Sequence, residues 1–189
     1  MPKEIPKIEE VPKRETEYTE NGLWRKISEK NEKGQLIYER KREFKNPFEP
    51  KEGEIKYDYE KRLTYDEESN LVKEEGKSFD HENGWRKEFE WEERKLAKET
   101  GEITGGPNQG HKWTKGFHYD ENGNMVLEEG EILEQGKNPD KPPKGHSWRT
   151  KHLYENGKWI GEIGKSTNGS KEGKVWTKGK VSEEDIKNL

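Results

Sequence analysis

The stretch WTKGFHYDENGNMVLEEGEI, residues 113–132, has the pattern of a β-hairpin. Trp113, Phe117 and Tyr119 share parity, so in an extended strand their side chains project from one face. The segment DENGN supplies turn chemistry, because Asn and Gly tolerate the positive φ of tight hairpin turns. MVLEEGEI then returns as the second strand. Because a single two-stranded hairpin is marginal in water, we expect this unit to be repeated.

The same pattern occurs five times along the chain. Each copy begins with an aromatic first anchor, and a second anchor follows 11 or 12 residues later. The anchor pairs are Trp24 and Leu36, Tyr59 and Leu71, Trp85 and Leu96, Trp113 and Met125, and Trp148 and Trp159. A glutamate stands three residues after the second anchor in every copy. A constant hairpin with connectors of variable length is typical of a repeat array.

The copies at the two ends of the array differ from the others. Trp176 begins a lone closing strand, and the first copy is degenerate. It has Ser28 and Lys30 where the other copies carry aromatic or apolar residues. Terminal repeats are often atypical in this way.

Composition limits how the chain can fold. Hydrophobic residues make up 24% of it and charged residues 41%, and the mean hydropathy is −1.54. Disorder requires a high net charge as well, whereas the net charge here is −4. Two packed layers each need a continuous apolar face, which these strands do not offer. The sequence therefore predicts an all-β fold, an extended, essentially single-layer antiparallel meander of five hairpins and a closing strand. A loosely closed barrel or a folded-over sandwich, with the aromatic residues inside, is the alternative.

Three segments are predicted along the chain. Residues 1–20, rich in Pro, Lys and Glu, are interpreted as an extended N-terminal arm. Residues 21–181 form the repeated hairpin sheet. Residues 182–189 form a short helical tail, with Ser182 as N-cap. The chain has no cysteine and no apolar run long enough to span a membrane. Because the first 22 residues have no apolar core, we do not expect them to act as a secretory signal.

The titratable residues do not form a recognisable catalytic or metal site. Five histidines are present, but none has HxxxH or HExxH spacing, and a metal site needs three or four converging ligands. Glycoside hydrolysis needs a cleft and one acid of raised pKa, which a single wet layer does not readily provide. We expect the repeated glutamates to pair laterally with lysines instead. The prediction is a protein that is not an enzyme, with no catalytic residues, no metal and no cofactor.

The aromatic residues of successive copies are predicted to form rows. Neighbouring strands lie about 4.8 Å apart, so the rows have a step of roughly 9.6 Å. The three rows are Trp85, Trp113, Trp148 and Trp176; Phe89, Phe117 and His152; and Trp91, Tyr119 and Tyr154. Packing explains any single ring. Rows of flat rings on an exposed face also suit a long, flat, uncharged ligand, such as the apolar faces of pyranose rings.

Nucleic acid also stacks on aromatic rings, but its binders usually carry a basic excess. This chain has a pI of about 5.9 and a negative net charge. The predicted partner is therefore a polysaccharide, with neither nucleic acid nor membrane as ligand, and we expect a monomer.

The C-terminal third resembles a known family. The residues that carry the resemblance are Trp148-Arg-Thr, Asn156-Gly157, Trp159, Gly164-Lys165-Ser166, Gly169 and Trp176, with His111, Trp113, Tyr119-Asp120 and Gly123 upstream. This set resembles the tryptophan-rich region of the plant early-starvation and like-early-starvation proteins. The resemblance implies a long antiparallel sheet in the plastid, at the starch granule, whose aromatic stripes bind starch glucans and help to order amylopectin. The doubled tryptophans typical of that family are missing.

Rows and resemblance together give one set of candidate carbohydrate-binding residues. The set is Trp85, Phe89, Trp91, Trp113, Phe117, Tyr119, Trp148, Tyr154, Trp159 and Trp176.

Two other interpretations stay open. The segments YDENGN (119–124) and NGLW (21–24) resemble bacterial antitoxin-like repeats related to MORN units, which bind proteins. A cysteine-free chain rich in Lys and Glu would also fit a designed scaffold without a natural ligand.

Overall fold

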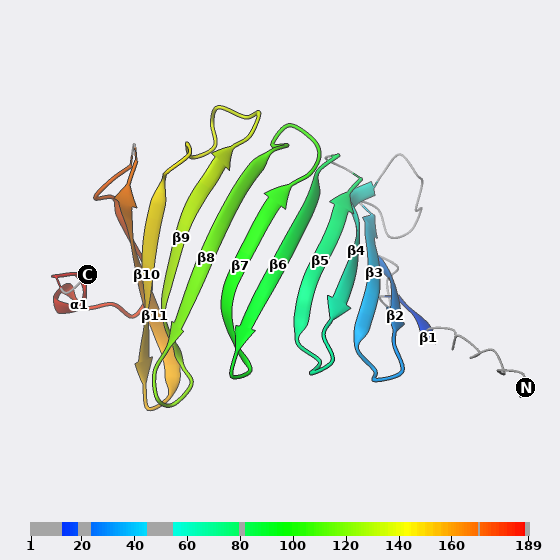
Figure 1. The fold of residues 1–189 in the computed structure, drawn as a ribbon, viewed down its shortest axis with the longest axis horizontal. Coiled ribbons are helices and arrows are strands. Elements are labelled where there is room, and N and C mark those ends of the chain that lie inside the picture. Colours follow the sequence, from blue (N-terminus) through cyan, green and yellow to red (C-terminus); the bar gives the residue numbers. More distant parts are fainter. Residues whose placement is uncertain (1–12, 19–23, 45–54, 80–81, 170, 188–189) are drawn as a thin grey trace, which may run out of the picture.

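The computed structural model describes residues 13–18, 24–44, 55–79, 82–169 and 171–187, and all structural statements concern these residues. Twelve strands lie side by side in chain order in a single sheet, with one short helix, α1, beyond the β12 edge (Figure 1). Every pairing between neighbouring strands is antiparallel. β1 and β12 do not pair with each other, so the sheet is an open, single-layer meander. This confirms the predicted fold class.

The elements have the following bounds: β1 Lys13–Tyr18, β2 Trp24–Lys30, β3 Leu36–Phe44, β4 Ile55–Tyr65, β5 Leu71–Ser78, β6 Gly84–Glu92, β7 Lys95–Ile103, β8 His111–Tyr119, β9 Met125–Gln135, β10 Ser147–Glu155, β11 Lys158–Asn168, β12 Val175–Gly179 and α1 Glu183–Lys187.

The sheet begins earlier than the sequence predicts. Residues 13–18, placed by the sequence in an N-terminal arm, form β1 and pair with β2. Glu17 stands opposite Lys26, with 3.6 Å between Oε1 and Nζ, as Glu74 stands opposite Lys87 further along the sheet. The sequence pattern missed β1 because Arg14 stands three residues before Glu17, where the other hairpins have an apolar or aromatic second anchor. Residues 1–12 and 19–20 of the predicted arm lie outside the described part of the chain.

A β-bulge recurs at the same place in all five hairpins. In β6–β7, Glu90 pairs with Lys98 and Trp91 with Leu96, which leaves Ala97 as the extra residue. The equivalent extra residues of the other hairpins are Ile37, Val72, Val126 and Ile160. Bulges bend a strand and increase its twist, and they are retained features of a fold. The shared bulge confirms that one hairpin unit is repeated.

In three of the five hairpins the turn is held by the side chain of its first residue, which is Asn31, Asp66 or Asp120. The Asp120 carboxylate accepts hydrogen bonds from the backbone N–H groups of Asn122 (2.9 Å) and Asn124 (2.8 Å). Bonds from Asn124, chiefly from its side chain, lower the pKa of Asp120. Gly123 in the same turn has a φ of +83°, as the sequence DENGN predicts.

The two faces of the sheet have different compositions. We call the face with the side chains of Trp85, Lys87, Phe89 and Trp91, and their equivalents on other strands, the indole face. The opposite face is the charged face, crossed by ion pairs such as Arg86–Glu75 (2.8 Å). Among the described hydrophobic residues, Ile132 and Ile163 alone are buried. Neither face is therefore covered by a second layer, and rigidity has to come from within the sheet.

Tryptophan rings packed on glycines stabilise the indole face. Four tryptophans stand directly opposite a glycine of the preceding strand: Trp85 and Gly76, Trp113 and Gly101, Trp148 and Gly130, and Trp176 and Gly164. A Cβ on any of these glycines would come within 1.9–2.2 Å of a ring atom. Each glycine is therefore required for space, since the indole occupies the volume that a side chain would take.

We expect Gly101→Ala to lower the free energy of unfolding by about 1–3 kcal/mol, because the added methyl group displaces the Trp113 ring. Gly116→Ala in β8 is the matched control, since a Cβ there has no heavy atom within 4 Å. The control is expected to change stability by less than about 1 kcal/mol, in either direction. Urea unfolding measures both variants. Equal losses of stability would contradict the packing role of Gly101.

Candidate functional site

The first aromatic row is fixed by hydrogen bonds as well as by packing. The Trp113 indole Nε1–H donates to Glu99 at 2.9 Å, and Glu99 stands two residues before the glycine under the ring. Equivalent bonds join Trp85 to Glu74 (2.9 Å) and Trp148 to Glu128 (3.3 Å). In β4, the Tyr59 hydroxyl donates to Glu39 at 2.5 Å in the same way. The rings therefore lie flat on the sheet, with their polar atoms satisfied from within it.

A row of alternating charges runs beside the tryptophans. Lys61 Nζ lies 3.8 Å from carboxylate oxygens of both Glu39 and Glu74, which belong to the strands on either side. Lys115 and Glu128 form a similar pair at 3.4 Å. The expected lateral pairing with lysine is thus present for Glu39, Glu74 and Glu128 of the five repeated glutamates. The sequence did not predict that the same carboxylates also accept the indole N–H groups.

The third aromatic row, which contains Trp91 and Tyr119, links neighbouring hairpins. The Trp91 Nε1–H donates to the Leu71 carbonyl at 2.7 Å, and the Tyr119 hydroxyl donates to the Leu96 carbonyl at 3.1 Å. Tyr65 makes the equivalent bond to Leu36 at 3.1 Å. Each acceptor is the second anchor of the preceding hairpin. Partial burial raises the pKa of the Tyr119 hydroxyl. These rings also present apolar surface, because their polar atoms are already bonded.

All ten candidate carbohydrate-binding residues lie on the indole face. The candidates on β6, β8 and β10 lie there because their positions share parity along each strand. Trp176 lies there because its ring packs on Gly164. Trp159 lies there because the Nζ of Lys178, a neighbour of Trp176 on the same face, is 5.6 Å from the centre of its ring. Eight of the ten are half-buried, while Trp159 and Trp176 are 44% and 36% exposed. None is enclosed in a core. Because the strands follow chain order, equivalent rings recur on alternate strands.

His152 occupies the ring position between Trp148 and Tyr154 on β10. Its Nδ1 lies 3.6 Å from a carboxylate oxygen of Glu162, and its Nε2 is buried with no hydrogen-bond partner among the described residues. His152 therefore fills the row that Phe89 and Phe117 occupy in the preceding hairpins.

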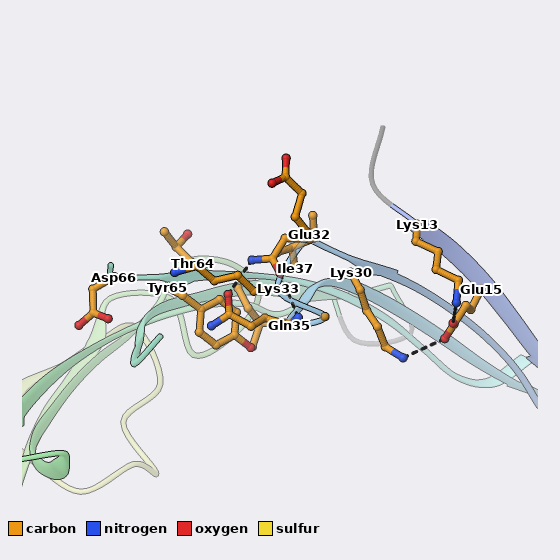
Figure 2. A pocket seen from close by; sticks show the side chains of 13 residues that line it. Lys13, Glu15, Lys30, Glu32, Lys33, Gln35, Ile37, Thr64, Tyr65 and Asp66 are labelled. Carbon is orange, nitrogen blue, oxygen red and sulfur yellow. Dashed lines mark hydrogen bonds and ion pairs between the residues drawn. The ribbon is translucent and has the colours of Figure 1, made fainter. Parts of the chain in front are cut away.

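A hollow of about 880 Å³ opens beside Lys30, where the first hairpin has no ring equivalent to those of later hairpins. Lys30 takes the place that Tyr65 and Trp91 hold in the next two hairpins, and its ammonium group turns towards Glu15 (3.0 Å). Figure 2 shows Lys13 and Lys30 both reaching the Glu15 carboxylate, with Tyr65 on the far wall. Hydrogen bonds from Lys13 and then Lys30 lower the pKa of Glu15 from 4.5 to about 2. The hollow is thus a polar end to the third aromatic row.

Other kinds of site are not evident in the described part of the chain. No group of three His, Asp or Glu side chains there could hold a metal ion. None of its helices has the length and apolarity needed to cross a membrane. No protein-family model matches this sequence, and no curated protein matches it either. The resemblance to the plant starch proteins therefore stays a prediction.

We expect the Glu15 carboxyl to titrate near pH 2 and, in Lys30→Met, closer to its ordinary value of 4.5. A lowered pKa in the folded state stabilises the fold above pH 4.5, and this contribution is lost as the pH falls through about 2. NMR titration of the side-chain carboxyl carbon measures the shift. Lys33→Met is the control, because Lys33 lines the hollow but donates to the Glu67 carbonyl (3.1 Å). A midpoint of 4.5 in the unmodified chain would contradict this role of the two lysines.

Proposed function

We propose that this protein binds starch-type α-glucan through its indole face, without catalysis, and thereby organises polysaccharide chains. The main observation in support is that the aromatic rings are fixed in place by contacts within the sheet. The Trp113 ring rests on Gly101 and its N–H is bonded to Glu99, so its outer apolar surface is what remains for a ligand. Rings fixed before binding lose little conformational entropy when a ligand arrives.

The arrangement of the rings supports a long, repeating ligand. Equivalent rings stand on alternate strands, roughly 9.6 Å apart across the sheet. Trp85 stands opposite Ile103 and Trp113 opposite Gly101, so each ring is also shifted by two residues, or roughly 7 Å, along the strands, and the rows cross the sheet obliquely. The tryptophan row and the Tyr65–Trp91–Tyr119 row are separated by about six residues of strand, or roughly 20 Å. A polymer of flat, uncharged rings can contact many such positions at once, and each contact can be weak.

The charges of the indole face support a neutral, hydroxyl-bearing ligand. Its lysines and glutamates alternate and bond to one another, as Lys61 does to Glu39 and Glu74. A nucleic acid would need lysines or arginines in excess along the row to neutralise its phosphates. A sugar hydroxyl can both donate and accept a hydrogen bond. The ammonium groups of the lysines can donate to it, and the carboxylates of the glutamates can accept from it. A starch ligand would place the protein in a plastid.

We expect the double variant Trp113→Leu/Trp148→Leu to co-sediment with insoluble starch roughly tenfold more weakly than the unmodified protein. Leucine keeps an apolar side chain on the glycine but removes the flat ring, and each stacked ring contributes on the order of 1 kcal/mol. Far-UV circular dichroism checks that the double variant keeps its strands.

Two control variants separate ring stacking from other effects. Phe79→Leu removes a 42% exposed ring that Arg40 (4.8 Å) and Lys77 (4.6 Å) flank on the charged face, so binding should not change. Tyr119→Phe removes one hydroxyl but keeps a ring on the indole face, so binding should again persist. Equal retention of the double variant and the unmodified protein would exclude the indole face as the starch-binding surface.

A further inference from the structure

The outer side of β12 carries hydrogen-bonding groups with no strand beside them. Ser166 N–H donates to the Lys174 carbonyl (2.9 Å) and Lys180 N–H donates to the Ile160 carbonyl (2.8 Å), at the two ends of the β11–β12 ladder. In an antiparallel ladder such bonds recur at every second residue, so the even-numbered residues of β12 face β11. The N–H and C=O groups of Val175, Thr177 and Gly179 therefore point outwards. Within the described part of the chain, β12 pairs with β11 alone.

The two edges of the sheet are protected to different degrees. Charged side chains on an edge strand hinder pairing with another sheet. Four of the six residues of β1 are charged, namely Lys13, Arg14, Glu15 and Glu17. β12 has the sequence VWTKG, with Lys178 as its one charge, and all five of its residues are exposed. Val175 is 40% exposed. The β12 edge is thus the one suited to accept a further strand.

Trp176 lacks a contact that the inner tryptophans have. Trp85 and Trp113 each stand between a glycine on the preceding strand and an isoleucine, Ile103 or Ile132, on the following strand. Trp176 has Gly164 on one side, and no described strand follows it on the other. A strand added at this edge would cover the open side of the Trp176 ring.

We propose that β12 pairs antiparallel with β12 of a second copy of this chain, across a two-fold axis at Thr177. In this register Thr177 stands opposite Thr177, where their hydroxyls can bond. Val175 stands opposite Gly179, which has no side chain to obstruct it. Trp176 stands opposite Lys178, and an ammonium group beside an indole is a favourable contact. The strand is thus complementary to itself, as a two-fold interface requires.

The pairing would join two indole faces into one. Residues directly opposite each other in a sheet point to the same side, and Trp176 and Lys178 both belong to the indole face. The pairing of the two β12 strands therefore places both indole faces on the same side of one continuous sheet. Helix α1 leaves the edge accessible, because all five residues of β12 are exposed in its presence. The pairing contrasts with the monomer expected from sequence, and it does not depend on glucan binding.

The first test is the mass of the protein in solution by analytical ultracentrifugation, from micromolar to millimolar concentration. We expect the unmodified chain to pass reversibly from monomer to dimer, since a short edge interface is weak. Thr177→Pro removes one outward N–H and no bond to β11, and it should stay monomeric. Thr177→Val keeps the N–H and should still dimerise. A monomeric unmodified chain at millimolar concentration, or dimerisation of Thr177→Pro, would overturn the proposal.

The second test reads the register directly, because the chain has no cysteine of its own. Directly opposed, hydrogen-bonded residues have Cα atoms about 5.5 Å apart, a separation that a disulfide can span. Thr177→Cys should therefore form a disulfide-linked dimer on oxidation. Two Val175→Cys residues would lie roughly 14 Å apart, which is too far. Linkage of Val175→Cys but not Thr177→Cys would overturn the register. Efficient linkage of Thr177→Cys to Thr16→Cys in β1 would show a head-to-tail contact instead.

Discussion

The contact between an indole ring and a glycine takes the place of a hydrophobic core in this protein. A single sheet exposed to water on both sides cannot gain stability from a second layer, and the described chain buries just two hydrophobic side chains, Ile132 and Ile163. The indoles instead cover the backbone of the neighbouring strand, where glycine leaves it bare. The Glu99 carboxylate and its equivalents then satisfy the ring nitrogen. Apolar burial and hydrogen bonding are thus both achieved within one layer.

This way of stabilising the sheet also shapes its outer surface. A ring that lies flat covers the strand beneath it and turns a broad apolar surface outwards. The same Trp113 ring therefore contributes to stability and to the proposed site, and the two roles cannot be separated by removing it. Substitutions that keep an apolar side chain but remove the planar ring are informative for this reason. Among the residues that the structure describes, the charged face has no such rows of rings, and its lysines and arginines are matched by carboxylates such as Glu75 and Glu129.

Much of the fold could be predicted from local patterns. Parity placed the rings of each hairpin on one face, and DENGN predicted the turn at Asp120, because both depend on residues close in sequence. The stacking of Trp113 on Gly101 could not be predicted, because it joins two different hairpins through a connector of variable length. β1 escaped prediction because Arg14 replaces the apolar or aromatic second anchor that marks the other return strands. The hollow at Lys30 follows from the degenerate first copy, but its ion pairs require the position of β1.

The chain-order topology has a consequence for how the sheet forms and comes apart. Each strand packs against its immediate neighbours in sequence, so no contact waits for the distant ends of the chain to meet. Folding can start in any hairpin and propagate to the neighbouring strands, and such local contacts favour a high folding rate. Unfolding can in turn begin at either edge strand and remain partial, because the inner hairpins keep the contacts with their neighbours. The molecule should therefore behave as a chain of linked units of graded stability.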